Sequence, residues 1–181
     1  MNTQAITWQK GQYNPGGIND IWYLLPEDVA TFPAAADPVG ATTFSSLVEL
    51  ADPIVMKTGK RAWPLYCTLE TGELKATIVG NRDGKGYENS AELSFPGSQS
   101  DFEGFKAWMA NRDIILIVRE KNGVLRVLGD LEDPAFLDTD ASTSGKKIAD
   151  SRASVLTFKA NNSTSAKIYM SAIDSLLVAA A

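Results

Sequence analysis

The residue types that carry out most enzyme chemistry are scarce in this chain, which has no histidine and one cysteine, Cys67. Without histidine, the Ser–His and Cys–His pairs that activate nucleophiles cannot form, and histidine-ligated zinc or iron sites are excluded. A single cysteine rules out an intramolecular disulfide and cysteine-rich zinc motifs. Cys67 lies in an apolar stretch with Trp63, Leu65 and Tyr66, which indicates a small buried hydrophobe.

A serine–lysine pair is the next candidate for nucleophilic chemistry. The segment Ser144-Gly145-Lys146-Lys147 matches the S-x-x-K pattern, and Lys57-Thr58-Gly59 matches the K-T-G element of penicillin-recognising enzymes. Their order is inverted relative to those enzymes, no S-D-N element lies between them, and no helix is expected to carry the serine. We therefore interpret both segments as loops.

Phosphate and calcium motifs are incomplete as well. The glycine-rich segment 80–85 is too short for a phosphate-binding loop, and Gly86 stands where a Ser or Thr would bind magnesium. We interpret it as a tight surface turn. Alternating oxygen-bearing side chains from Asp138 onward are similar to the start of a calcium loop. However, Thr143 occupies the position of the turn glycine and Ala149 that of the bidentate glutamate.

Paired carboxylates can hydrolyse a glycosidic bond without histidine when they lie about 5–10 Å apart. With 22 Asp and Glu residues in the chain, such pairs arise by chance, and the sequence gives no sign of an aromatic-lined cleft. We predict that the protein is not an enzyme and has no catalytic, cofactor-binding or metal-binding residues. A hydrolase with paired carboxylates is retained as a minor alternative.

Charge and hydropathy limit the possible partners. The formal net charge is -5, and the basic residues are dispersed, with Lys146-Lys147 only a pair. Because neutralised phosphates supply most of the affinity for nucleic acids, specific DNA or RNA binding is disfavoured. The chain has no apolar run of roughly 18 residues that would span a membrane, and segment 1–12 has no secretory signal. We expect no membrane partner and a cytoplasmic product, unless the protein leaves the cell in a larger particle.

The elements that must position these residues are mainly strands. A length of 181 residues suits one domain, and turn signals at Asn14-Pro15-Gly16-Gly17 separate an amino-terminal arm, 1–17, from a single β-rich domain, 18–181. Apolar and alternating segments predict further strands, the less regular of them at 42–50. These predicted strands are 18–25, 42–50, 65–69, 74–79, 87–95, 114–118, 154–160 and 166–171.

Local turn and helix signals refine this prediction. One helix is expected at about 101–111, with Ser100 and Glu103 as a capping box. The dipeptide Asn122-Gly123 predicts a hairpin with a two-residue turn, which places Val118 opposite Val127 and Arg119 opposite Arg126. This like-charge pair is unfavourable unless acidic neighbours surround it or the register differs slightly. The apolar run 114–118 predicts a strand covered on both faces.

Three other segments complete the prediction. Glu70-Thr71-Gly72-Glu73 is typical of a compact hairpin turn between the flanking strands. The polar segment Asp130 to Asp150 predicts a long loop, which is unusual in a compact domain and is often functional or ordered by a partner. The apolar tail Ile173 to Ala181 is expected to form either a core strand or a contact with another subunit. The predicted fold is a β-sandwich or barrel of antiparallel strands with one packed helix.

Three segments carry a pattern when they are taken in order: VGNRDGKGYENSAELSFPG (79–97), DFEGFKAWMANRDIILIVREKNGVLRVLGD (101–130) and TSGKKIADSRASVLTF (143–158). Together they resemble tail tube-type virion proteins of phages and prophages of Bacteroidetes. The resemblance covers roughly Ile54 to Tyr169 and rests on the order of these segments. It implies a sandwich or barrel flanked by a helix, assembled as hexameric rings that stack into a hollow tube.

By the same resemblance, neighbouring subunits continue each other's sheets around a lumen that carries genomic DNA only as passing cargo. The loop 130–150, the arm 1–15 and the carboxyl tail would then reach the next ring. The resemblance implies a virion location, with the host cytoplasm before assembly, and other virion proteins as partners. Alternatives are a head, neck or tail-terminator ring protein, or a small-molecule or carbohydrate-binding sandwich with Trp22, Trp63 or Trp108 exposed in a cleft.

Overall fold

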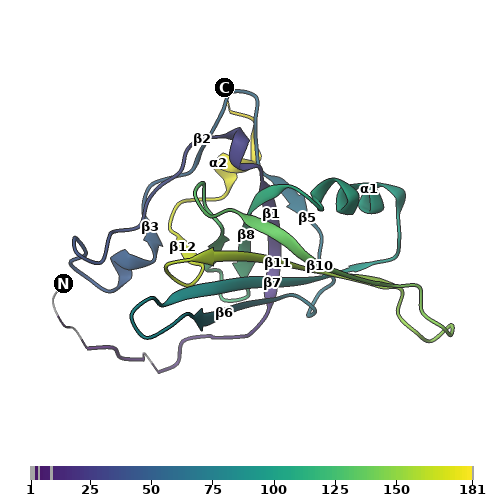
Figure 1. Cartoon of the computed structure of the whole chain (residues 1–181), viewed down its shortest axis with the longest axis horizontal. Coiled ribbons are helices and arrows are strands. Elements are labelled where there is room, and N and C mark those ends of the chain that lie inside the picture. Colours follow the sequence, from purple (N-terminus) through teal and green to yellow (C-terminus); the bar gives the residue numbers. More distant parts are fainter. Residues whose placement is uncertain (1–2, 4, 9, 181) are drawn as a thin grey trace.

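The computed structural model describes residues 3, 5–8 and 10–180 and contains mostly strands (Figure 1). The strands are β1 (Ile18–Leu24), β2 (Val29–Thr31), β3 (Glu49–Leu50), β4 (Val55–Met56), β5 (Trp63–Leu65), β6 (Glu73–Val79), β7 (Gly86–Pro96), β8 (Asp113–Glu120), β9 (Leu125–Leu128), β10 (Ala135–Thr143), β11 (Ala153–Asn162) and β12 (Lys167–Tyr169). The helices are α1 (Ser100–Met109) and α2 (Asp174–Leu177), with short 3-10 turns η1 (Pro26–Asp28) and η2 (Ser45–Leu47). Neither α-helix in this described part of the chain is long and apolar enough to cross a membrane.

One branched sheet dominates the fold. Strand β8 pairs with β1, β9 and β10, so that the sheet divides into two layers. We call β5, β1, β8, β9, β12 and β3 the first layer, and β10, β11, β7 and β6 the second layer. The pairing is antiparallel throughout except between β12 and β3. A mainly β fold with one packed helix of more than one turn is therefore confirmed.

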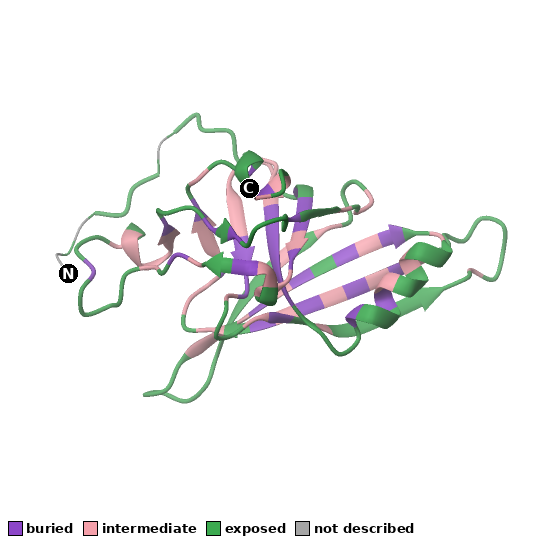
Figure 2. Cartoon of the chain, turned by 90° about the horizontal axis from the view of Figure 1, so that it is seen from above, coloured by how far each residue is buried: buried purple, intermediate pink, exposed green. Residues whose placement is uncertain are grey.

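The main hydrophobic core lies between the two layers, whose strands cross each other at a steep angle in Figure 1. Side chains on alternate positions of each strand point into it, as expected for sheets that pack face to face. Figure 2 shows this alternation along the long strands of the second layer. The members of this core that are fully inaccessible are Ala91, Leu93, Met109, Ile114, Leu116, Val118, Ala135, Leu156, Phe158 and Ala160.

A second core covers the opposite face of the first layer. Ile115 and Ile117 of β8 point into it and are fully buried, while Ile114, Leu116 and Val118 point into the main core. The prediction that this strand is covered on both faces is confirmed. The cover comes from the segment 29–62, which supplies residues such as Leu50, and from the carboxyl tail.

Helix α1 packs on the part of the second layer that extends beyond the first layer (Figures 1 and 2). The ring centroids of Phe102 and Phe95 are 4.5 Å apart, and those of Phe105 and Tyr23 are 5.4 Å apart. Met109 is fully buried in the main core. The apolar stripe of the helix thus faces the sheet, as its spacing predicts.

The predicted capping box is wrong. Gln99 occupies the N-cap position without a side-chain cap bond, and Ser100 is the first helical residue. The helix ends at Met109 instead of Asn111. The Glu103 carboxylate lies 2.9 Å from the Lys106 ammonium one turn later, so it is used in an ion pair and not as a cap.

The hairpin around Asn122-Gly123 exists, but its register differs by one residue from the prediction. Val118 lies opposite Arg126, and the turn has three residues, with Gly123 at a φ of 91°. Three-residue turns of this kind end on a left-handed residue, a conformation that glycine adopts easily. Arg119 faces Leu125, and the predicted arginine pair is avoided.

The predicted hairpin across segment 70–73 is wrong. Strand β5 pairs with β1 in the first layer, whereas β6 pairs with β7 in the second layer. The connection crosses between layers, and Glu70 adopts a left-handed φ of 63° within it. The short apolar runs on either side of this turn therefore have different partners.

The long loop predicted at 130–150 is also wrong. Strand β10 begins at Ala135 and pairs with β11 up to Thr143, so the connection that follows spans only residues 144–152. The less regular strand predicted at 42–50 is reduced to the two residues of β3, preceded by η2.

The carboxyl tail forms neither a strand nor an exposed arm. It contains one helical turn, α2, and Ile173 and Leu176 are 4% and 1% exposed in the second core. The backbone N–H of Ala62 donates to the Leu176 carbonyl at 2.7 Å, which fixes the tail to the preceding segment. Of the described arm residues, Ile6, Trp8 and Tyr13 expose large apolar side chains.

Candidate functional site

The residues with calcium-like spacing are bound to lysines in this fold. Asp138 lies 3.2 Å from the Lys159 ammonium, and Asp140 lies 3.2 Å from the Lys106 ammonium. These carboxylates therefore already have cationic partners from the same chain. Within the described residues, no group of three or more His, Cys, Asp or Glu side chains could hold a metal ion.

The serine–lysine segments are structural turns far from each other. In segment 144–147, the backbone N–H groups of Lys146 and Lys147 donate to the Asp150 carboxylate at 2.8 and 2.9 Å. In segment 57–59, the Lys57 ammonium donates to the Glu27 carbonyl at 2.7 Å. This segment is also hydrogen-bonded to the carboxyl end of the chain. No Ser–Lys contact forms between these two described segments.

The glycine-rich segment 80–85 is the turn between β6 and β7. Gly80 has a φ of 98°, and a Cβ added there would lie 2.2 Å from the Gly84 carbonyl oxygen. Glycine is therefore required at position 80 by the close approach of the backbone, whereas an added Cβ at Gly84 would meet no atom within 4 Å. Cys67 is half-buried and not fully buried, with its Sγ 3.5 Å from the Thr68 carbonyl oxygen.

The tryptophans do not gather in one cleft. Trp22 is buried in the second core. Trp63 and Trp108 are 46% and 39% exposed, and the guanidinium groups of Arg61 and Arg112 lie 4.0 and 4.6 Å from their ring centroids. A guanidinium over an indole face is a stable pairing of its own. It also covers one of the two faces of each indole on which a sugar or aromatic ligand would stack.

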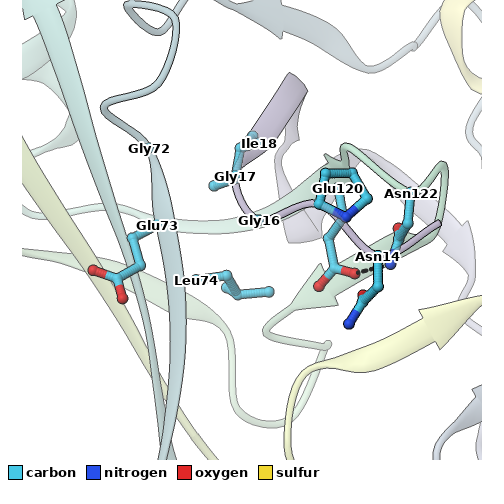
Figure 3. A pocket seen from close by; sticks show the side chains of 10 residues that line it. Asn14, Gly16, Gly17, Ile18, Gly72, Glu73, Leu74, Glu120 and Asn122 are labelled. Carbon is cyan, nitrogen blue, oxygen red and sulfur yellow. Dashed lines mark hydrogen bonds between the residues drawn. The ribbon is translucent and has the colours of Figure 1, made fainter. Parts of the chain in front are cut away.

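A surface hollow lies between the arm, the beginning of β6 and the β8–β9 hairpin (Figure 3). Its lining residues are Asn14, Pro15, Gly16, Gly17, Ile18, Gly72, Glu73, Leu74, Glu120 and Asn122. The Glu120 carboxylate accepts a hydrogen bond from the Asn122 amide at 3.2 Å. In Figure 3 the Glu73 carboxylate points away from that of Glu120, and it is paired with Lys75 at 2.9 Å. The two acids do not converge as a hydrolytic pair would.

The most distinctive surface is made by the two edges of the second layer. Strand β6 pairs with β7 on one side only, and its outer edge is open, with Ile78 and Val79 55% and 42% exposed. Strand β10 has nine residues, of which only Ala135 and Phe136 pair with β8. Among the described strands, the remainder of β10 has β11 as its one partner. Both edges thus present unpaired backbone groups.

The outward face of the second layer is polar and open to solvent. Ala91 and Leu93 of β7 are buried. Because successive side chains of a strand point to opposite faces, Glu88 and Glu92 point outward. The Lys159 ammonium lies 3.6 Å from Glu88 and 3.2 Å from Asp138. Lys75, whose register places it on the same face, is paired with Glu73, so both of these described lysines have carboxylate partners.

Two partly buried ion pairs, Lys106–Asp140 and Lys167–Asp130, connect distant elements. Burial of the Lys106 ammonium would lower its pKa, but hydrogen bonds to Glu103 and Asp140 outweigh burial and raise it. Burial of Asp130 would raise its pKa, but the Asp133 N–H and the Lys167 ammonium outweigh burial and lower it. Neither Lys106 nor Lys167 was identified from the sequence, because Asp140 and Asp130 lie far from them in the chain.

Comparison with known proteins gives no relative from which a function could be transferred: no family model, curated protein or solved structure matches this chain.

Proposed function

We propose that this protein is a structural subunit that assembles with copies of itself through the two edges of the second layer. The main observation that supports this proposal is that one four-stranded layer is open at both sides, at β6 and along most of β10. Monomeric proteins usually shorten, charge or cover such edges to prevent association. Here β6 is seven residues long and keeps Ile78 exposed.

Strand directions support pairing between copies. The order β6, β7, β11 and β10 alternates in direction, so β6 and β10 run antiparallel to each other at opposite sides of the layer. If a second copy is rotated about an axis parallel to these strands, its β6 is antiparallel to the β10 of the first copy. Such a contact joins two different surfaces and generates closed rings or open filaments.

Within this class, we propose a tail tube-type virion subunit whose rings stack and enclose a channel for genomic DNA. The proposal is supported by the resemblance of the segments between Ile54 and Tyr169 and by the polar outward face of the second layer. A wall on which Lys75 and Lys159 are each paired with carboxylates offers no free cation to phosphates. A hexameric ring, other virion proteins as partners and a virion location belong to the same proposal.

A ring protein of the head, neck or tail terminus is the alternative in the same class, and it would form rings that do not stack. A ligand-binding sandwich has weaker support, because Trp22 is buried and the indoles of Trp63 and Trp108 lie under guanidinium groups. Ligand-dependent tryptophan fluorescence would favour that second class.

Electron microscopy of the purified protein at high concentration tests the proposal. We expect rings or tubes of regular bore, and Ile78→Lys should prevent them while leaving the monomer folded, because it places a charge on the β6 edge. Val39→Lys is the matched control, since Val39 is 93% exposed and lies outside both edges. A strictly monomeric wild type at millimolar concentration would contradict self-assembly, and normal assembly of Ile78→Lys would exclude the β6 edge.

A further inference from the structure

The β10–β11 hairpin changes character along its length. Close to the first layer, its inward side chains are apolar, as at Leu137 and Phe158, and they pack in the main core. In the far half, the register places Asp140 and Ser142 of β10 and Ser154 of β11 on the same inward side. This far half lies beyond the first layer and faces α1 (Figure 1). A polar surface of this kind cannot hold a helix by hydrophobic contact.

Lys106 of α1 lies against this polar surface. Its ammonium is 2.8 Å from Ser142 Oγ, 3.3 Å from Ser154 Oγ and 3.2 Å from the Asp140 carboxylate. The Glu103 carboxylate, on the same helix, lies 2.9 Å away. The Lys106 side chain is only 8% exposed, so its charge depends on these partners.

The other anchors of α1 are on different strands. Phe102 packs on Phe95 of β7, and Phe105 packs on Tyr23 of β1. Met109 is buried in the main core. Removal of the Lys106 contacts would therefore leave the helix attached to the core, while the far half of β10 would lose its polar contacts with the helix.

We propose that Lys106, Glu103, Asp140, Ser142 and Ser154 form a latch, which fastens the far half of β10 to α1 and holds the open β10 edge extended for pairing with a second copy. The last part rests on the proposed function. A strand with one partner strand and a terminal loop exchanges between ordered and frayed forms, and an extra attachment shifts this equilibrium toward the ordered form. A preformed edge lowers the ordering cost that association must overcome.

Hydrogen exchange in dilute solution tests the latch. Lys106→Met keeps the approximate length of the side chain but removes the ammonium, which also lies 5.5 Å from the Phe102 ring centroid. We expect amides of residues 139–143 and 153–156 to exchange about tenfold faster or more, as the loss of hydrogen bonds to a charged group implies. Amides of β8, at residues 115–118, report global unfolding and should change much less.

Lys147→Met is the matched control, because Lys147 is an exposed lysine on the same hairpin. It should leave exchange in both regions within twofold of wild type. Asp140→Asn is the second variant, since Asp140 is 35% exposed and the change keeps its size. It should accelerate exchange in the far half of β10 less than Lys106→Met does. Unchanged exchange in both latch variants would overturn the proposal.

Assembly measured in parallel separates this proposal from the previous one. Faster exchange in the hairpin together with weaker assembly of Lys106→Met supports the latch and its role in pairing. Faster exchange with normal assembly would overturn that role but retain the latch. If wild type never assembles, the proposed function fails, and the exchange experiment still decides whether the latch exists.

Discussion

Single lysine side chains join parts of this protein that are distant in the sequence. Lys106 connects α1 to the β10–β11 hairpin, and the Lys167 ammonium lies 2.9 Å from the Asp130 carboxylate at the turn that leads into β10. The Asp130 and Lys167 side chains are 16% and 18% exposed, whereas Lys106 is 8% exposed and its partner Asp140 is 35% exposed. Exposed ion pairs contribute little to stability, but removal of one partner of a shielded pair is costly because it leaves the other charge without its partner.

Asp130 has several partners in this fold. One carboxylate oxygen accepts the backbone N–H groups of Glu132 and Asp133 at 3.0 and 2.8 Å, and the other faces Lys167. These contacts favour the ionised form and hold its pKa below the ordinary value of 3.8. A lowered pKa stabilises the folded state at pH values above 3.8, and this stabilisation is lost as the pH falls through the pKa of the folded protein.

The first prediction at the residue scale concerns the variant Asp130→Asn. It should lower the free energy of unfolding at pH 7 by about 1.5–3 kcal/mol, because it removes a charged partner of Lys167 but keeps an oxygen for the turn. The difference from wild type should shrink as the pH falls below 3.8. Urea unfolding at several pH values measures it.

The neighbouring variant Asp133→Asn serves as its control. It makes the same change of charge three residues later in the same turn, on an exposed side chain. It should alter stability little. Equal losses for Asp130→Asn and Asp133→Asn would show that general charge, and not the contact with Lys167, governs stability.

At the scale of elements, the turn between β9 and β10 determines where β10 begins. Gly129 has a φ of 84°, and a Cβ added there would lie 2.5 Å from the Ala135 nitrogen. Both the backbone angle and the close approach require glycine. This turn places β10 beside the beginning of β8 and β11 beside β10.

We predict that Gly129→Ala destabilises the protein by about 1–3 kcal/mol, as a strained backbone does. Gly104→Ala is the opposite case, because Gly104 lies inside α1, has no positive φ and leaves open space for a methyl group. It should stabilise by about 0.5–1 kcal/mol. Thermal unfolding of both variants tests these two predictions. A stabilising effect of Gly129→Ala would contradict the turn geometry.

Strand β10 forms one of the two open edges of the second layer. Strand β10 was not expected from the sequence, because its residues after Leu137 are polar on both faces, with Ala141 as the exception. The outward face meets solvent, and the inward face meets Lys106 and not the hydrophobic core. A strand of this kind lacks the alternation of apolar and polar residues by which a strand is recognised.

At the scale of the whole molecule, the first layer is covered on both faces, so the protein contains two cores and not the single core of a simple sandwich. The carboxyl tail is part of the second core. Leu176 is 1% exposed, whereas Val178 is 70% exposed two residues later. The tail is therefore expected to stabilise the fold of its own chain.

We predict that Leu176→Ala lowers the free energy of unfolding by about 2–5 kcal/mol, as expected for a fully buried leucine. Val178→Ala should change it by less than about 0.5 kcal/mol. Chemical unfolding of the dilute monomer measures both. If Leu176→Ala affected only assembly and not the stability of the monomer, the tail would be an intersubunit element.

The sequence by itself determined the fold class, the burial of β8 on both faces and the approximate place of α1. These features follow from local composition and periodicity, which indicate which residues are buried. The absence of histidine excludes its catalytic pairs and metal sites by composition alone, because no fold can supply a missing side chain.

Only the tertiary structure decided which strands pair and which surfaces stay open. The segments around Glu70 have similar apolar runs, yet β5 joins the first layer and β6 the second. The far half of β10 pairs with β11, and Lys106 from a separate helix lies within hydrogen-bond distance of its inward carboxylate and hydroxyl groups. Local patterns specify burial, but strand partners and buried ion pairs depend on contacts between residues far apart in the chain, and the sequence pattern does not contain them.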